Sequence, residues 1–156
     1  MKNCANRRIM FICLGNICRS PMAEFVMRDL VKKQGHADSI SIKSSATSTW
    51  EIGNPVYPPA AAELARHGIS CNGKHAEKLT AQDYGKYDMF ICMDRQNLRD
   101  SIEIFGGDPD GKVSMLLSHA GEAREVADPW YTGDFSTAYS DIVKGCTAIL
   151  AELFGD

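Results

Sequence analysis

The chain has 156 residues, of which 44% are hydrophobic and 24% are charged, and its formal net charge is −3 at pH 7. This length and composition predict a single globular domain over residues 1–156. No stretch of about 18 consecutive apolar residues is present, which excludes a membrane-spanning helix, and the acidic balance argues against a nucleic-acid-binding protein. The polar start of the chain is not typical of a signal peptide, so we expect a cytoplasmic protein.

Six cysteines are spread along the chain: Cys4, Cys13, Cys18, Cys71, Cys92 and Cys146. We expect reduced thiols, because a chain of this length does not need cross-links and no export signal is visible. The sequence contains no Cys-x-x-Cys pair and no histidine at zinc-finger spacing from a pair of cysteines. We therefore expect no metal.

The first two predicted elements meet within the first quarter of the chain. The segment RRIMFI (7–12) is typical of a short buried strand. Ser20-Pro21 then predicts a helix start, with the serine as N-cap and the proline at the first helical position. Apolar residues recur at every fourth position after it, and Gly35 is expected to end this helix.

Strands and helices continue to alternate in the rest of the chain. The segment SISIKS (39–44) alternates isoleucine with polar residues, as in a half-buried strand. The further predicted elements are a helix from about Pro59 that ends before Gly68, a short helix over 80–84, strands over 89–93 and 113–117, a helix capped by Asp94 that reaches Phe105, and a helix over 135–154. This order predicts an α/β fold with three layers, in which a parallel sheet carries helices on both faces.

The segment CLGNICRS (13–20) joins the first strand to the first helix. Ligands of parallel sheets bind beyond the carboxyl ends of strands, where free N–H groups and the helix dipole favour an anion. Gly15 allows the backbone to approach a ligand closely, Asn16 tolerates a left-handed conformation, and Arg19 can bind two phosphate oxygens. The same field would stabilise a thiolate at Cys13, so the segment predicts a phosphate-binding loop with a sulfur nucleophile.

The pattern Cys-x5-Arg alone is weak evidence for a phosphate-binding loop, and the neighbouring residues strengthen it. An apolar strand precedes it, a glycine and an asparagine lie inside it, and a Ser-Pro helix start follows it. The alternative is a buried cysteine followed by a structural turn. Neither G-x-x-x-x-G-K-[ST] nor G-x-G-x-x-G occurs, which leaves this loop as the candidate phosphate site.

The loop CLGNICRSP resembles the active-site loop of the low-molecular-weight protein tyrosine phosphatases. SSATSTWEIGNP (44–55) resembles the substrate-mouth loop of that family, and FICMDRQNLRD (90–100) resembles its central strand and following helix. ADPWYTGDF (127–135) is similar to its general-acid loop. The segments occur in the family's order over nearly the whole chain. The resemblance implies a four-stranded parallel sheet and a phosphotyrosine phosphatase that needs no metal or cofactor.

The resemblance also implies a role for each matching residue. Cys13 would be the nucleophile, Arg19 the phosphate clamp, and Asp128 the general acid and then the general base. The residues that would form the network holding the loop are Asn16, Ser20, Ser44 and His75. The residues expected to bind the substrate are Leu14, Gly15, Asn16, Ile17, Cys18, Ser20, Trp50, Trp130 and Tyr131. These roles predict hydrolysis through a phosphocysteine intermediate.

Three positions bear on substrate and regulation. Cys18 lies five residues from Cys13 and is either a packing residue or the partner of Cys13 in a reversible disulfide that prevents over-oxidation. Family members that act on phosphoarginine carry threonine where this chain has Ile17, so the isoleucine favours an aryl ring. Trp130 lies where many relatives have tyrosine. We expect phosphotyrosine proteins as substrates, inorganic phosphate or other oxyanions as product or inhibitor, and a monomer or weak dimer.

Two other functions remain open from the sequence. An arsenate reductase of related fold also uses a thiol in a Cys-x5-Arg loop, but it needs further cysteines as a relay, and Cys71 and Cys92 are far apart in sequence. A catalytically silent module that binds phosphoproteins would be more credible if Cys13 or Asp128 were missing. Both residues are present.

Overall fold

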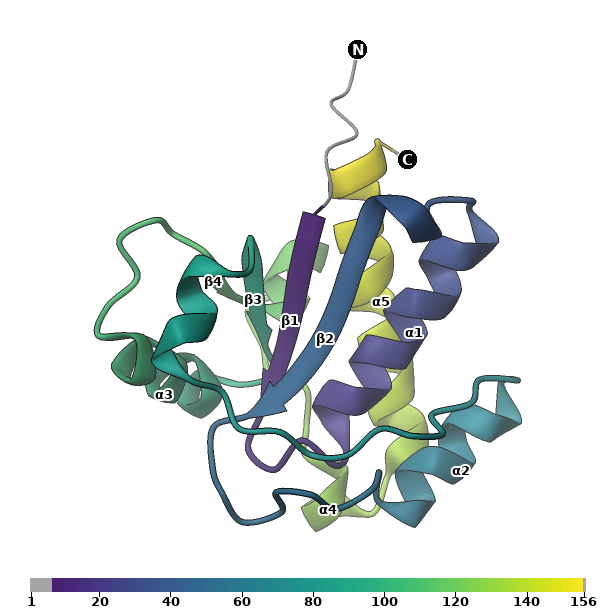
Figure 1. Cartoon of the computed structure of the whole chain (residues 1–156). Helices are drawn as coiled ribbons and strands as arrows, with labels where there is room; N and C mark the ends of the chain where they lie inside the picture. Colours follow the sequence, from purple (N-terminus) through teal and green to yellow (C-terminus); the bar gives the residue numbers. More distant parts are fainter. Residues whose placement is uncertain (1–6, 156) are drawn as a thin grey trace.

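A sheet of four parallel strands forms the centre of the molecule (Figure 1), for which a computed structural model describes residues 7–155. The strands are β1 (Arg7–Cys13), β2 (Ile40–Ala46), β3 (Met89–Cys92) and β4 (Val113–Met115), in the order β2-β1-β3-β4. Strand β1 pairs with both of its neighbours: Cys13 lies opposite Ala46 of β2, and Ile12 lies opposite Cys92 of β3. The predicted strands over 7–12, 39–44 and 89–93 are confirmed to within two residues.

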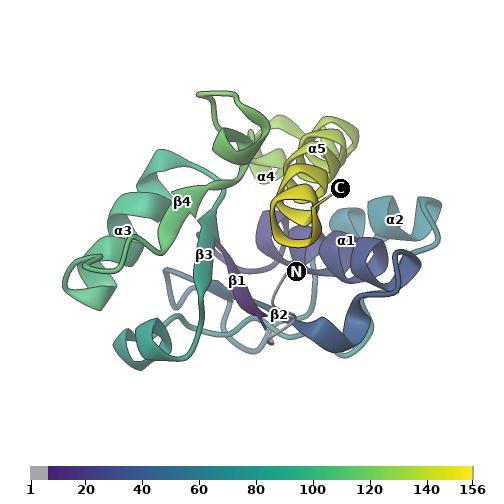
Figure 2. The ribbon, with the colours of Figure 1, turned by 90° about the horizontal axis from the view of Figure 1, so that it is seen from above.

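Helices cover both faces of this sheet, which confirms the three-layer α/β fold. Figure 2 shows α3 (Arg95–Phe105) on one side, and α1 (Arg19–Lys33) and α5 (Phe135–Phe154) on the other. Helix α2 (Pro58–Arg66) packs on α1 and α5. The short helix α4 (Pro129–Thr132) lies near the carboxyl ends of the strands. None of the helices in the described part of the chain is long and apolar enough to cross a membrane.

Alternating side chains of β1 build a separate core on each face of the sheet. Ile9 and Phe11 are fully buried in the larger core, with apolar residues of α1 and α5. Met10 and Ile12 point the other way and pack in a smaller core with Phe90 and residues of α3. Burial of both faces explains why this strand is a continuous apolar run rather than an alternating one.

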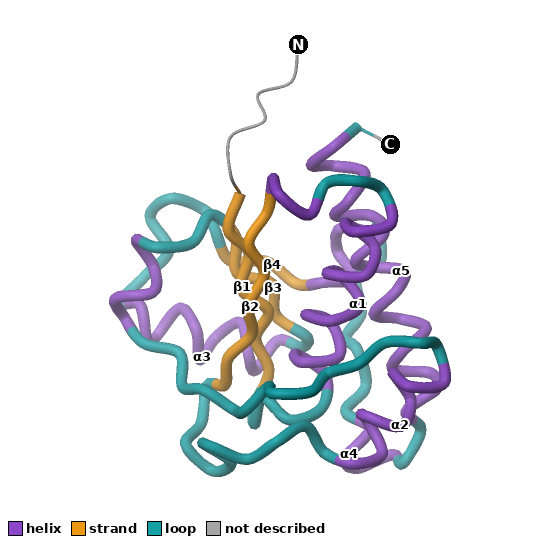
Figure 3. The backbone as a smooth tube through the Cα atoms, turned by 45° about the vertical axis from the view of Figure 1, so that its right-hand side comes forward, coloured by secondary structure: helices purple, strands orange, loops and turns teal. Residues whose placement is uncertain are grey.

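The strand order places a topological switch point between β1 and β3. From β1 the chain crosses through α1 to β2 on one side, and it later returns to β3 on the other side of β1. The carboxyl ends of both strands open onto the same edge, where loops gather (Figure 3). Ligands of open α/β sheets bind at such a point. Cys13 at the end of β1 and Asp94 just beyond β3 both lie there.

Two predicted boundaries are wrong. Helix α1 begins at Arg19 with Cys18 as N-cap, instead of having Ser20 as its N-cap, because the Ser20 hydroxyl contacts the Cys13 sulfur. Strand β4 ends at Met115, and a 3-10 helix follows from Leu116 to Ala120.

Other predicted boundaries are confirmed. Asp94 caps α3 and accepts from the N–H of Asn97 at 2.8 Å, and Phe105 ends that helix. Gly68, with a φ of +76°, lies just past α2. Cys4 lies outside the described residues, and the other five cysteines are free thiols.

Candidate active site

Residues 13–20 form a loop around the amino-terminal end of α1. Asn16 has a φ of +59°, so the left-handed conformation that the sequence allowed is adopted here. Among the described residues, the N–H groups of Gly15, Ile17 and Cys18 donate to no backbone carbonyl, and no side chain caps α1. Free N–H groups at a helix start form a binding site for an anion.

The Cys13 thiol lies at the floor of this loop and is surrounded by donors. Its sulfur lies 2.9 Å from the Ser20 hydroxyl oxygen, and it accepts from the backbone N–H groups of Asn16 at 3.3 Å and Ser20 at 3.4 Å. Only 3% of Cys13 is exposed. Two backbone N–H groups and one hydroxyl group therefore converge on the sulfur, in a site from which water is mostly excluded.

Three acceptors from distant parts of the chain hold the side chain of Arg19 in place. Its Nη1 donates to Asp94 Oδ2 at 2.9 Å and to the Val126 carbonyl at 2.8 Å, and its Nη2 lies 3.4 Å from Asp128 Oδ2. Burial opposes the charge on the guanidinium. Negative neighbours, Cys13 first and then Asp128, outweigh burial and raise the pKa of Arg19. The side chain is therefore a fixed cation beside the thiol.

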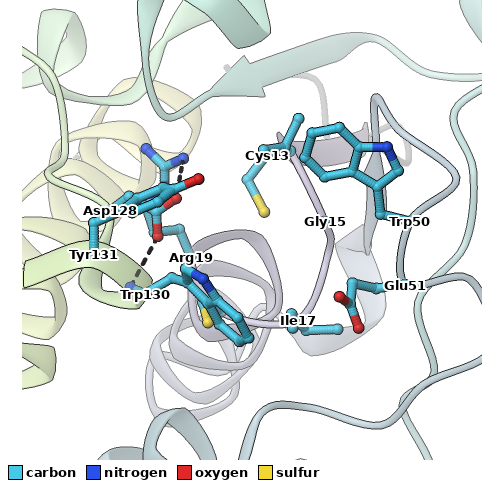
Figure 4. A pocket seen from close by; sticks show the side chains of 11 residues that line it. Cys13, Gly15, Ile17, Arg19, Trp50, Glu51, Asp128, Trp130 and Tyr131 are labelled. Carbon is cyan, nitrogen blue, oxygen red and sulfur yellow. Dashed lines mark hydrogen bonds and ion pairs between the residues drawn. The ribbon is translucent and has the colours of Figure 1, made fainter. Parts of the chain in front are cut away.

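Asp128 is held by the start of α4. Its Oδ1 accepts from the N–H of Trp130 at 3.0 Å, which makes it the N-cap, and Pro129 occupies the first helical position. Its side chain is 22% exposed. In Figure 4 the Cys13 sulfur lies between Trp50 on one side and Asp128 on the other. Asp128 and Cys13 therefore line the same pocket.

A pocket of about 140 Å³ opens above the sulfur. It is lined by Cys13, Leu14, Gly15, Ile17, Cys18, Arg19, Trp50, Glu51, Asp128, Trp130 and Tyr131. The aromatic residues belong to the rim, because Trp50 is 72% and Tyr131 is 76% exposed. Trp130 packs against Tyr57, with ring centroids 4.6 Å apart. Aromatic walls above a deep thiol suit a flat substituent that carries its phosphate at the tip.

The structure brings three of the four predicted network residues together. The Asn16 amide donates to Ser20 Oγ at 2.8 Å and to Ser44 Oγ at 2.9 Å. His75 lies outside this network: it is exposed, and its Nδ1 contacts the Gly73 carbonyl at 3.2 Å. Lys74 takes the inward position instead, because successive side chains of an extended segment point to opposite sides.

Four residues of the site were not found from the sequence. Asp94 was predicted only as a helix cap, although its place after a central strand put it at the switch point. Glu51 follows Trp50 directly in the mouth loop. Glu24 is a charged residue on the buried side of α1, and only 3% of it is exposed. Lys74 lies in a polar segment, and nothing in that segment predicts that its side chain is buried.

The other thiols differ sharply from Cys13 in their surroundings. Burial, followed by the nearby Cys13 and Asp128, raises the pKa of Cys18, so this thiol stays protonated at neutral pH. Burial raises the pKa of Cys92 to about 12, which makes it a poor member of a thiol relay. Within residues 7–155, no group of three or more histidine, cysteine, aspartate or glutamate side chains is arranged to hold a metal ion.

One pocket thus contains a thiol with hydrogen-bond donors around it, a fixed arginine and a carboxylate. This combination is typical of enzymes that use a thiol nucleophile on phosphate esters. The family model described as "Low molecular weight phosphotyrosine protein phosphatase" matches residues 8–156. The low molecular weight protein-tyrosine-phosphatase YfkJ of Bacillus subtilis is 37% identical over 147 residues, which cover 93% of this chain and 94% of that protein. The low molecular weight phosphotyrosine protein phosphatase of Homo sapiens is 37% identical over 153 residues, which cover 94% and 95%.

Solved structures agree with these relatives. The crystal structure of YfkJ from Bacillus subtilis matches with a TM-score of 0.92 and 36% identity, over 95% of this chain and 94% of that one. The crystal structure of DARP, a Drosophila arginine phosphatase, matches with a TM-score of 0.86 and 28% identity, over 95% and 98%. The chain belongs to the low-molecular-weight phosphotyrosine protein phosphatase family.

Proposed function

We propose that this protein hydrolyses phosphotyrosine in proteins, and small aryl phosphates, through a phosphocysteine intermediate. One observation carries the proposal: the Cys13 sulfur, with three donors around it, lies at the floor of a pocket that also contains Arg19 and Asp128. The walls of that pocket are aromatic, which fits the phenyl ring of the substrate.

In the first step the Cys13 thiolate attacks phosphorus in line with the leaving oxygen. The S–P bond forms while the bond between phosphorus and the phenolic oxygen breaks. Asp128, in its protonated form, gives its proton to that oxygen, so the phenol leaves neutral. Free N–H groups of the loop and the Arg19 guanidinium bind the three equatorial oxygens throughout, which is catalysis by positioning and electrostatics.

In the second step a water molecule hydrolyses the phosphocysteine. Asp128, now a carboxylate, takes a proton from the water as its oxygen bonds to phosphorus, and the S–P bond breaks. Sulfur departs as a thiolate. The Ser20 hydroxyl, 2.9 Å from the sulfur, is placed to donate to it. Inorganic phosphate is the product, and Asp128 is again protonated for the next cycle.

The pocket favours an aryl phosphate over a short alkyl phosphate. Cys13 is 3% exposed and lies below an aromatic rim, so only a long, flat substituent can bring its phosphorus to the sulfur. Ile17 contributes an apolar side chain to the lining of the pocket, against which a phenyl ring packs better than a guanidinium. These features support phosphotyrosine rather than phosphoserine or phosphoarginine.

Single-turnover hydrolysis of p-nitrophenyl phosphate tests the mechanism. We expect a burst of p-nitrophenol from the wild type and none from Cys13→Ser. Asp128→Ala should slow the burst by about 10²–10⁴-fold and recover with a better leaving group, because that group needs no proton. Cys71→Ser is the matched control, since this thiol lies outside the pocket and the burst should persist.

Other outcomes would replace the proposal. Hydrolysis by Cys13→Ser at the wild-type rate would reject the sulfur nucleophile. A wild type that binds phosphate without turnover would be a silent binding module. Faster turnover of a phosphoarginine peptide than of the matched phosphotyrosine peptide, measured as kcat/KM, would overturn the choice of substrate.

A further inference from the structure

The segment that leads into Asp128 is held by the body of the protein. Two positions before Asp128, the N–H of Val126 donates to the Met93 carbonyl at 2.9 Å. The Val126 carbonyl accepts from Arg19 Nη1 at 2.8 Å, and the Val126 side chain is buried. The chain therefore reaches the proposed general acid from a fixed point.

The segment that follows Asp128 has weaker local support. It is the helix α4, which has only 4 residues, and an isolated helix of this length is unstable in water. Pro129 is buried, whereas the other three residues of α4 are exposed. The N–H of Trp130 nevertheless donates to Asp128 Oδ1 at 3.0 Å (Figure 4). The position of α4 therefore sets the direction of the Asp128 carboxylate.

Tyr57 connects α4 to the phosphate-binding loop (residues 13–20). The phenol ring of Tyr57 and the indole ring of Trp130 have their centroids 4.6 Å apart and their planes at 49°, which is within the range of stabilising aromatic pairs. The Tyr57 ring also packs with Phe135 against Ile17 in a small apolar cluster. The backbone N–H of Tyr57 donates to the Ile17 carbonyl at 2.9 Å. Tyr57 therefore contacts α4 with its ring and the phosphate-binding loop with its backbone.

The local sequence holds Tyr57 itself in one conformation. Tyr57 is the N-cap of α2, with a φ of −57° and a ψ of 131°, and Pro58 and Pro59 follow it. A proline restricts the residue before it to extended conformations and suits the first turn of a helix. The Tyr57 carbonyl accepts from the N–H groups of Ala60 at 2.9 Å and Ala61 at 3.0 Å. The ring of Tyr57 is therefore a fixed surface on which Trp130 packs.

We infer that Tyr57 is a positioning residue of the active site: its ring holds Trp130, and the Trp130 N–H in turn holds the Asp128 carboxylate for proton transfer to the leaving group. The inference rests on the proposed function, in which Asp128 is the general acid. Tyr57 does not line the pocket, so it acts without touching the substrate. Its contacts fix the acid relative to the bound phosphate, and proton transfer depends on that geometry.

The dependence of kcat/KM on the leaving group tests this role. Tyr57→Ala removes the ring and keeps the N–H that binds the Ile17 carbonyl. We expect kcat/KM for phenyl phosphate to fall about tenfold, as for the loss of one strong aromatic contact. With 2,4-dinitrophenyl phosphate kcat/KM should stay within about twofold of the wild type, because this leaving group needs no proton. The Ki of inorganic phosphate should be unchanged, since the phosphate-binding loop keeps its own contacts.

Further variants separate positioning from a general loss of stability. Tyr57→Phe keeps the ring and should retain the kcat/KM of the wild type for phenyl phosphate. Tyr139→Ala is the matched control: it removes another partly buried tyrosine ring from the main core, one that stacks on His67 with centroids 3.8 Å apart. It should leave the ratio of kcat/KM for the two substrates unchanged. If Tyr57→Ala fails to fold, Tyr57→Leu keeps much of the apolar volume without the aromatic ring and should change that ratio in the same direction.

A double variant shows whether Tyr57 acts through Asp128. In an Asp128→Ala background, Tyr57→Ala should lower kcat/KM for phenyl phosphate no further. A second readout needs no turnover: the chain has two tryptophans, so Trp50→Phe leaves Trp130 as the single fluorescent indole. In that background Tyr57→Ala should increase the quenching of Trp130 fluorescence by acrylamide, and Tyr57→Phe should not.

Several results would overturn the inference. In Tyr57→Ala these are equal losses of kcat/KM for the two substrates, a rise in the Ki of phosphate that matches the loss, or unchanged quenching of Trp130. An equal change of the ratio in Tyr139→Ala, or a full further loss in the Asp128→Ala background, would do the same. The two proposals fail separately. A wild type without a burst but with the expected quenching would reject phosphatase activity, while a normal burst with equal losses in Tyr57→Ala would reject the role of Tyr57 alone.

Discussion

Two charged clusters lie at or near the loop formed by residues 13–20. We call them the pocket cluster (Arg19, Asp94 and Asp128) and the interior cluster (Glu24, Arg28 and Lys74). In the pocket cluster one contact is loose, since Arg19 Nη2 and Asp128 Oδ2 are 3.4 Å apart and Asp128 is 22% exposed. In the interior cluster Glu24 accepts from Ser44 at 2.5 Å and from Arg28 at 2.8 Å.

This difference suits the two clusters to different roles. The general acid of the proposed mechanism must exchange protons and contact the substrate, and Asp128 has the loose ion pair and the access to water that this role needs. Glu24 does not line the pocket, and it has hydrogen-bond partners at both of its oxygens. Both clusters contain ion pairs, and they differ in how fully their carboxylates are hydrogen-bonded.

The largest effect on kcat/KM should follow from replacing Arg19, the cation of the pocket cluster. Arg19→Lys keeps the charge but cannot reach Asp94 and the Val126 carbonyl while also binding two phosphate oxygens. We expect kcat/KM for p-nitrophenyl phosphate to fall by about 10²–10³-fold, nearly as far as in Arg19→Ala. Arg95→Lys, on the exposed start of α3, is the control. A loss of less than about tenfold would mean that charge alone suffices at this position.

Asp94→Asn should have a smaller effect on kcat/KM. This variant separates the two roles of Asp94, which caps α3 and accepts a hydrogen bond from Arg19. Asparagine is as good an N-cap as aspartate, so α3 should keep its stability, but the charge that orients Arg19 is lost. We expect kcat/KM to fall about tenfold with Tm unchanged.

Asp94→Ala is the comparison, because it removes the cap as well and should lower the free energy of unfolding by about 1 kcal/mol more. Equal Tm losses in the two variants would show that Asp94 acts mainly as a structural residue. Steady-state kinetics and thermal unfolding measure the two tasks independently.

The pocket cluster was predictable from the sequence to a greater extent than the interior cluster. Cys13 and Arg19 lie in one contiguous segment whose turn residues and position after an apolar strand indicate a loop that binds anions. Asp128 came from the family resemblance and not from its surroundings in sequence. The fold followed from apolar runs and helix caps, which are local signals.

Lys74 and His75 show where such reasoning ends. Both are polar residues in a segment without apolar periodicity, so nothing in the segment itself decides which one points inward. The register comes from tertiary contacts, because the carbonyl of Glu77 accepts from Ala46 and its N–H donates to Asn16. Ser20 was predicted as an N-cap for the same reason: the sequence does not show that its hydroxyl already contacts Cys13.

We expect Cys18→Ser to change the rate of hydrolysis less than the variants above, because Cys18 lines the pocket but belongs to neither cluster. Its expected effect is on the response to oxidation. At alkaline pH peroxide oxidises the Cys13 thiolate to a sulfenic acid, and the Cys18 thiolate then displaces hydroxide from it to form a disulfide. We expect dithiothreitol to restore most of the starting activity of the wild type after such treatment. Cys18→Ser should recover little of its own starting activity, because its Cys13 proceeds to irreversible sulfonic acid.

The pH dependence of this protection follows from the raised pKa of Cys18, which comes from burial and then from Cys13 and Asp128. Below that pKa the thiolate fraction of Cys18 grows as pH rises, so disulfide formation should become faster toward alkaline pH. Mass spectrometry of peroxide-treated protein between neutral and alkaline pH measures the bridged fraction. Sulfonic acid at Cys13 with no bridge to Cys18 across this range would show that Cys18 is a packing residue and that the pocket has no built-in protection.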